Sequence, residues 1–119
     1  MDKLEKIIRA LDDKFAKDIV AIDMKLVSPM FDTFVICSAD NMRLMNAIKE
    51  NVQDELEKDG IVAKHVEGNK DSQWILMDYG DIIIHIFSPE ERNVYHLEKL
   101  WGDQHRIDIS EWIGQRHEL

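Results

Sequence analysis

The chain has 119 residues, of which 45% are hydrophobic, and its 15 basic and 24 acidic side chains give a formal net charge of -9 at pH 7. This length and apolar content suffice for one domain with a single core. The negative net charge opposes direct contact with a phosphate backbone, so we expect no direct binding of nucleic acid. No apolar run approaches the roughly 20 residues that cross a bilayer, and the start lacks a signal-peptide pattern, so we expect a cytoplasmic chain without membrane contact.

The first half of the chain alternates helical and strand patterns. Apolar residues at helical spacing predict amphipathic helices, and short β-branched apolar runs predict strands. These elements are a helix over 2–16, strands over 18–25, 33–38 and 61–66, and a helix between Asp40 and Gly60. Asp40 is placed to cap the second helix, and Gly60 to end it. The single cysteine, Cys37, lies inside an apolar run, where we expect a buried and unreactive thiol.

The stretch over 73–87 predicts an antiparallel hairpin, because two apolar runs flank a turn that contains a glycine. A two-residue loop would place Trp74 opposite His85, and Asp78 opposite Asp81. Strand alternation assigns one set of side chains to the core: Ile75, Met77, Ile82, Ile84 and Ile86. The other face mixes aromatic, ionisable and aliphatic groups, and we expect it to be only partly covered. Its residues are Trp74, Leu76, Asp78, Asp81, Ile83, His85 and Phe87.

A third helix follows the hairpin. Ser88 is placed as its cap, Pro89 as its first residue and Glu91 as the reciprocal partner of the capping box. We expect this helix to reach about Lys99, with a break at Gly102.

The order of the elements predicts an α/β fold: a mixed sheet of about five strands, flanked by helices. We expect a single domain over 1–102 and a C-terminal tail over 103–119. The tail has apolar residues among charges and could pack as an amphipathic segment on the domain or on another copy.

The usual patterns of catalytic sites are missing from the sequence. The five glycines are scattered, and no two histidines have ligand spacing within one predicted helix, so we predict no metal and no cofactor. His85 and Asp81 form the best pair, but two ligands are too few. Asp78 and Asp81 serve either binding or plain turn chemistry. Trp74, at a strand start, and Tyr79, at a turn tip, are hard to bury, which favours a docking surface.

Several of these residues occur in an order that resembles the ribosomal silencing factor family, also called RsfS or Iojap-like. The shared motifs are the runs 18–23, 32–37, 67–68, 74–78 and 80–81, then His85, Tyr95 and the run 97–101. The resemblance covers about 1–102 and implies a scaffold similar to nucleotidyltransferases. Those enzymes hold metals with two acids that alternate on a strand, but Ile83 follows Asp81 and Lys25 follows Asp23 at that spacing. The catalytic acids are therefore missing, and we expect no enzyme.

The resemblance implies a factor that binds the large ribosomal subunit through ribosomal protein L-fourteen, sterically blocks joining of the small subunit, and represses translation when nutrients are scarce. Residues that match the family's contact region are Trp74, Met77, Asp78, Tyr79, Tyr95, Glu98 and Lys99. Trp74 and Tyr79 are expected as apolar anchors, Asp78 and Glu98 as partners for basic side chains, and Tyr95 as a mixed contact.

Two other hypotheses stay open. The first is a residual metal-dependent nucleotidyltransferase that uses Asp78, Asp81 and His85. The second is a self-associating module, a homodimer in which Trp112 and its neighbours in the tail form the contact.

Overall fold

The computed structural model describes residues 2–69 and 71–114, except for the side chain of Glu98. Its strands form one five-stranded sheet in the order β1-β2-β5-β4-β3. Their bounds are β1 Lys17–Asp23, β2 Thr33–Ser38, β3 His65–Glu67, β4 Trp74–Asp78 and β5 Ile82–Phe87. The β2–β5 pair is parallel and the other pairs are antiparallel, so the predicted mixed sheet of five strands is confirmed.

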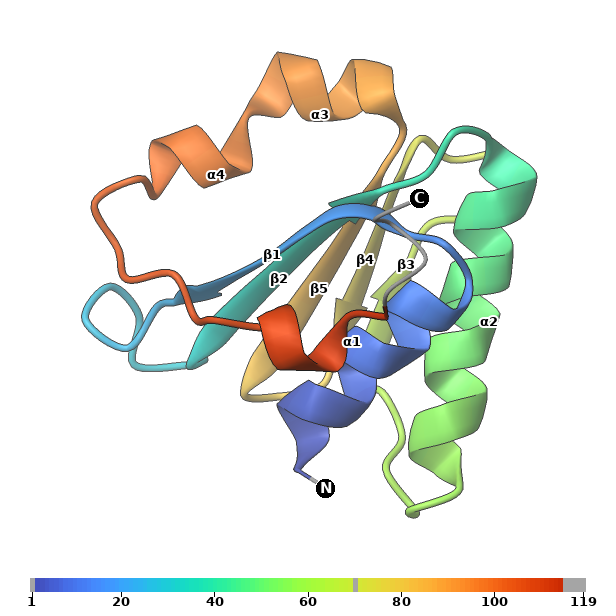
Figure 1. The fold of residues 1–119 in the computed structure, drawn as a ribbon, viewed down its shortest axis with the longest axis horizontal. Helices are drawn as coiled ribbons and strands as arrows, with labels where there is room; N and C mark the ends of the chain where they lie inside the picture. Colours follow the sequence, from blue (N-terminus) through green and yellow to red (C-terminus); the bar gives the residue numbers. More distant parts are fainter. Residues whose placement is uncertain (1, 70, 115–119) are drawn as a thin grey trace.

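Helices lie on both sides of this sheet (Figure 1). The α-helices are α1 Lys3–Asp13, α2 Met42–Glu57, α3 Pro89–Tyr95 and α4 Leu97–Leu100, and a short 3-10 helix, η1, spans Ser110–Trp112. α1 and α2 pack side by side against one face, whereas α3 and α4 run along the other. The two faces are therefore covered to different extents.

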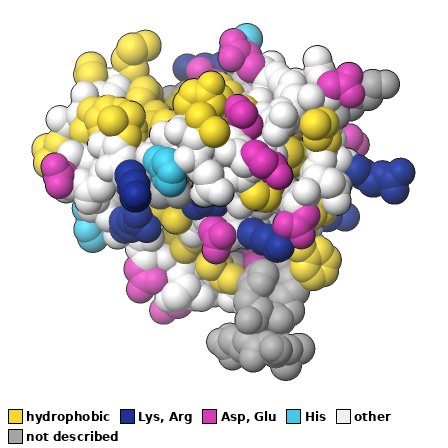
Figure 2. Space-filling view, turned by 90° about the horizontal axis from the view of Figure 1, so that it is seen from above, with side chains coloured by type: hydrophobic (Ala, Val, Ile, Leu, Met, Phe, Trp, Pro, Cys, Tyr) yellow, Lys and Arg dark blue, Asp and Glu magenta, His cyan; other side chains and the backbone are white. Residues whose placement is uncertain are grey.

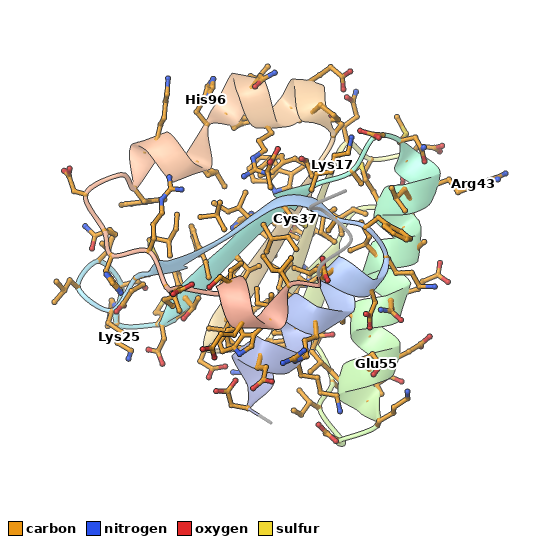
Figure 3. The ribbon with its side chains drawn as sticks, in the orientation of Figure 1. Lys17, Lys25, Cys37, Arg43, Glu55 and His96 are labelled. Carbon is orange, nitrogen blue, oxygen red and sulfur yellow. The ribbon has the colours of Figure 1, made fainter. Side chains whose placement is uncertain are left out.

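The main core lies between the sheet and the pair α1–α2. Each helix buries an apolar stripe, and the hairpin strands bury the side chains predicted for the core: Ile75, Met77, Ile82, Ile84 and Ile86. Cys37 lies in β2, an inner strand of the sheet (Figure 3), and is fully buried, and burial raises the pKa of its thiol to about 12. The thiol is therefore protonated and inert, as expected.

Two local predictions are wrong. Asn41, not Asp40, caps α2: the Asn41 Oδ1 atom accepts a hydrogen bond from the Leu44 N–H at 2.8 Å. The carboxylate of Asp40 is occupied instead by the Lys17 ammonium, at 2.8 Å. The third strand begins at residue 65 rather than 61, because the Ile61 N–H bonds back to the Leu56 carbonyl and closes the end of the preceding helix.

The hairpin turn differs from the prediction by two residues in register. Trp74 pairs with Phe87, and Asp78 with Ile83, while the Tyr79 N–H donates to the Ile82 carbonyl at 3.0 Å. The loop is therefore Gly80-Asp81, with Gly80 at a φ of +92°. A shift of two residues leaves the side chains of residues 74–78 and 82–87 on their predicted faces, because strand alternation has a period of two.

Residues 103–114 of the predicted tail pack on the domain. The Asp23 N–H donates to the His105 carbonyl at 2.8 Å, and the Ile107 N–H donates to the Ala21 carbonyl at 2.8 Å, so this segment pairs with the outer edge of β1. Gly114 then donates its N–H to the carboxylate of the buried Asp12 at 2.8 Å. Within the described ranges, no helix has the length and apolar character needed to cross a membrane.

Candidate functional site

The sheet face opposite α1 and α2 is only partly covered. Residues paired directly in neighbouring strands share a face, and the pairs Glu67–Leu76, Leu76–His85 and Trp74–Phe87 carry this face across β3, β4 and β5. Leu97 and Trp101 of the α4 region pack on the part over β1, β2 and β5. The uncovered part, which we call the open face, is formed by Glu67, Trp74, Leu76, Asp78, Ile83 and Tyr95, and the buried His85 lies beneath it.

Trp74 lies at the centre of an aromatic cluster on the open face. Its ring centroid is 4.9 Å from that of Phe87 and 4.8 Å from that of Tyr95. The indole is half-buried and Tyr95 is 48% exposed. The cluster therefore packs on the sheet while part of its surface stays accessible to a partner. Figure 2 looks down on the side that carries α3 and α4, and hydrophobic side chains lie there next to acidic ones.

The buried His85 accepts a hydrogen bond from Trp74. The indole Nε1–H donates a hydrogen bond to the His85 Nδ1 atom at 3.1 Å, and the imidazole is 4% exposed. Burial lowers the pKa of His85 to about 4, because the charged imidazolium would lose its solvation. The imidazole is therefore neutral near pH 7 and able to accept this bond.

A shallow pocket of about 230 Å³ adjoins the indole. It is lined by Glu67, Trp74 and Leu76, which offer a carboxylate, an aromatic face and an aliphatic wall. This combination suits the stem and charged head of a lysine or arginine side chain. A pocket of about 370 Å³ at the turn between α1 and β1 has no aromatic lining and lies away from the open face.

The two acids at the hairpin turn have separate structural partners. Asp78 accepts a hydrogen bond from the Gly80 N–H at 2.7 Å, which is turn chemistry, and its side chain remains half-exposed on the open face. Asp81 pairs with the Lys3 ammonium of α1 at 2.6 Å, and this hydrogen bond holds the pKa of its carboxyl below the ordinary value. The predicted proximity of Asp81 to His85 is therefore wrong.

The structure contradicts two of the predicted contact residues. Met77 is fully buried and Tyr79 is 4% exposed, and both belong to the main core. Tyr79 continues the inward-facing series of Ile75 and Met77 because the strand pairing extends one residue further than expected. Burial raises the pKa of its phenol to about 12. Neither side chain is available as a surface anchor.

Of the remaining predicted residues, Trp74, Asp78 and Tyr95 share the open face. Lys99 is exposed on α4, and the side chain of Glu98 lies outside the described part of the chain. The helix predicted to reach Lys99 is divided at His96, which has a φ of +46° and lies between α3 and α4 (Figure 3). Tyr95 is thus at the end of one helix and Lys99 on the next.

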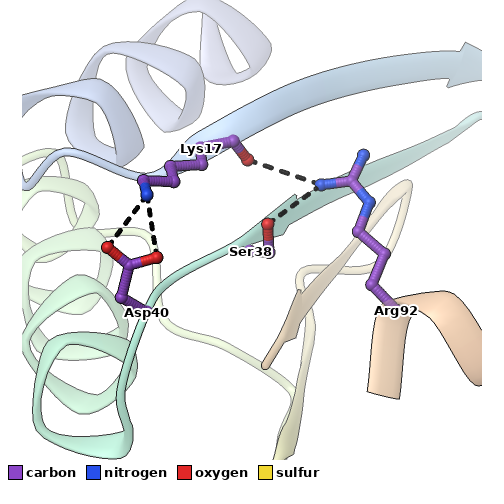
Figure 4. A network of polar contacts seen from close by, with 4 residues as sticks. All are labelled: Lys17, Ser38, Asp40 and Arg92. Carbon is purple, nitrogen blue, oxygen red and sulfur yellow. Dashed lines mark hydrogen bonds and ion pairs between the residues drawn. The ribbon is translucent and has the colours of Figure 1, made fainter. Parts of the chain in front are cut away.

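Arg92 fixes α3, and with it Tyr95, to the sheet (Figure 4). Its buried guanidinium donates to the Asp18 carbonyl at 2.7 Å, and to the Lys17 carbonyl and the Ser38 hydroxyl at 3.4 Å each. Ser88 caps the same helix through the Glu91 N–H at 3.2 Å, as predicted. The Ser88 N–H donates to the Gln73 carbonyl, so the reciprocal half of the expected capping box is replaced by a contact with the start of β4.

Three residues of this region were not predicted as contacts from the sequence: Glu67, Leu76 and His85. Alternation placed Leu76 and His85 on the correct face, but the role of Glu67 depends on its pairing with Leu76 across β3 and β4. A three-residue strand gives too little alternation to fix that register from sequence.

The described residues include no group of three or more histidine, cysteine, aspartate or glutamate side chains that could hold a metal ion. The candidate site is an aromatic and acidic patch on one face of the sheet of an α/β protein. Its residue types are those enriched in protein interfaces.

Comparison with known proteins identifies the family. A family model described as RsfS, ribosomal silencing factor during starvation, matches residues 1–118, beyond the point near 102 where we expected the shared pattern to end. The chain belongs to this family. A Bacillus subtilis protein named ribosomal silencing factor RsfS is 40% identical over 106 residues, which cover 89% of this chain and 90% of that protein.

Solved structures agree with this assignment. A Chromobacterium violaceum crystal structure superposes with a TM-score of 0.79 at 31% identity and covers 86% of this chain and 88% of that one. A Bacillus halodurans crystal structure gives a TM-score of 0.78 at 35% identity, with 88% and 95% covered. The predicted family resemblance and α/β fold are confirmed.

Proposed function

We propose that this chain is a ribosomal silencing factor that binds the large ribosomal subunit through ribosomal protein L-fourteen and prevents the small subunit from joining. It would act in the cytoplasm, as a repressor of translation without catalysis. The observation that carries the proposal is the open face, where Trp74 and Tyr95 form a half-exposed aromatic cluster beside Asp78 and Glu67.

The chemistry of the open face suits a basic protein partner. Large aromatic side chains provide much of the binding energy in protein interfaces, and acidic side chains around them favour encounter with Lys and Arg. The pocket beside Trp74 can take the stem of one such residue against Leu76, with its charged head near Glu67. The net charge of -9 favours a protein partner over the RNA backbone.

Co-sedimentation with isolated large subunits tests the proposal. We expect Trp74→Ala to weaken binding and to restore subunit joining, which a density gradient would measure. Phe15→Ala is a matched control, because Phe15 is an exposed aromatic at the end of α1, on the other side of the sheet. If Trp74→Ala binds large subunits as well as the wild type, the open face is not the binding surface.

The nucleotidyltransferase hypothesis gains no support from the geometry. Asp78 bonds to Gly80, Asp81 to Lys3 and His85 to Trp74. The three side chains therefore do not converge on one point. Calorimetry with magnesium and nucleoside triphosphates is the direct test, and we expect no heat of binding.

The homodimer remains a proposal, with a changed contact. Trp112 is half-buried and packs against the core of its own domain, so the described residues 103–114 offer less surface to a second copy than expected. If self-association uses the open face instead, it competes with the ribosomal partner. Light scattering of the wild type and Trp74→Ala would test this.

A further inference from the structure

The environment of His85 fixes the tautomer of its imidazole. The Trp74 indole nitrogen can only donate, so the His85 Nδ1 atom, 3.1 Å away, must be the acceptor and carry no proton. The single proton of the neutral ring is then on Nε2. That atom is buried and has no hydrogen-bond partner among the described residues.

This arrangement is unfavourable for the stability of the fold. A buried N–H without an acceptor has lost its solvation, and a leucine or phenylalanine would fill the same space without that penalty. Packing alone therefore does not account for a histidine at this position. The bond to Trp74 is the contact that an apolar residue could not make.

The other contacts of the indole are not directional. The rings of Phe87 and Tyr95, with centroids 4.9 and 4.8 Å from that of the indole, bury its surface through packing contacts. The hydrogen bond to Nδ1 is the contact that depends on which edge of the indole faces His85, so it selects one orientation of the ring.

We propose that His85 is a positioning residue for the open face, which holds the Trp74 indole in the single orientation that the partner recognises. This inference rests on the proposed function, because it assumes that Trp74 is a binding anchor. An anchor ordered before binding loses less conformational entropy in the complex, so the loss of His85 should mainly speed dissociation.

Two substitutions separate positioning from packing. His85→Asn keeps a side-chain acceptor near the position of Nδ1, whereas His85→Leu fills the space and removes the acceptor. In the free protein, we expect the Trp74 indole N–H, assigned by NMR with Trp74→Phe, to exchange with solvent about tenfold faster in His85→Leu, as the loss of one hydrogen bond implies. His85→Asn should remain close to the wild type.

The binding experiment uses the same variants and isolated large subunits. We expect His85→Leu to weaken binding by about tenfold, and His85→Asn to restore most of it. In a Trp74→Phe background, which lacks the indole donor, His85→Leu should have no further effect. An equal loss in both backgrounds, or unchanged indole exchange in His85→Leu, would overturn the proposal.

The two measurements also distinguish this inference from the proposed function. The exchange rate is measured without a partner and reports only whether His85 orders the indole. If the wild type does not bind large subunits, the proposed function fails whatever the exchange rate. If the rate changes as expected but Trp74→Ala binds subunits normally, the open face is not the binding surface and the assumption about the anchor is wrong. If Trp74→Ala abolishes binding while His85→Leu binds as tightly as the wild type, only the positioning role is wrong.

Discussion

The buried imidazole of His85 links the free energy of unfolding to pH. Its pKa is about 4 in the folded chain and near 6.5 when unfolded, so the unfolded state binds the proton first as the pH falls. The part of the free energy of unfolding that depends on a neutral His85 is fully present above pH 6.5 and is lost as the pH falls from 6.5 to 4. The predicted loss over this window is about 3 kcal/mol.

Urea unfolding at several pH values would measure this loss, with His85→Asn as the control because it lacks the titrating group. The carboxylates titrate in both proteins, so the difference between the two curves isolates the histidine. Parallel curves between pH 7 and 5 would mean that His85 is not buried as a neutral ring.

Tyr79 and Trp74 should respond differently to truncation, because they lie on opposite faces of the sheet. Tyr79→Ala removes a core ring and should lower the free energy of unfolding by about 3 kcal/mol. Tyr79→Phe keeps the ring and should bind subunits as the wild type does. Unfolding and co-sedimentation of both variants check this, and weakened binding by a stable Tyr79→Phe would show that the phenol is a contact.

At the scale of single elements, α2 offers a matched pair for its cap. Asn41→Ala removes the side-chain acceptor of the Leu44 N–H and should cost about 1 kcal/mol. Asp40→Ala removes an exposed ion pair with Lys17 and should cost less than about 0.5 kcal/mol. Urea unfolding of both variants ranks them. A larger loss for Asp40→Ala would mean that Asp40, as predicted from the sequence, is the cap.

The hairpin shows which features of an element can be predicted. Alternation placed Ile75, Ile82 and His85 on their correct faces, because a face depends only on parity. The turn was harder to place, since a loop of Tyr79-Gly80 and one of Gly80-Asp81 both use the glycine at positive φ. The observed loop allows the Lys3–Asp81 ion pair with α1, a tertiary contact that no local pattern contains. That difference moved Tyr79 from the predicted site to the core.

At the scale of the whole molecule, pairing between distant segments was the least predictable feature. The family resemblance and the strand patterns predicted the mixed sheet, but not that residues 105–107 would extend it beside β1. The segment is short and has no strand periodicity, so only the free edge of β1 specifies where it lies. The same limit applies to Glu67, whose place on the open face follows from pairing between β3 and β4.

The net charge of -9 predicts that association with a basic partner depends on salt. We expect the association rate constant for large subunits to fall about tenfold between low and physiological ionic strength, while the dissociation rate constant changes little, because steering acts over the screening length. Surface plasmon resonance at several salt concentrations would measure both constants.

Two matched variants separate the open face from the overall charge. Glu67→Gln and Glu50→Gln each change the net charge from -9 to -8, but Glu67 belongs to the open face and Glu50 is exposed on α2. The first should reduce the association rate and its salt dependence more than the second. Equal effects would mean that overall charge, and not the open face, guides the encounter.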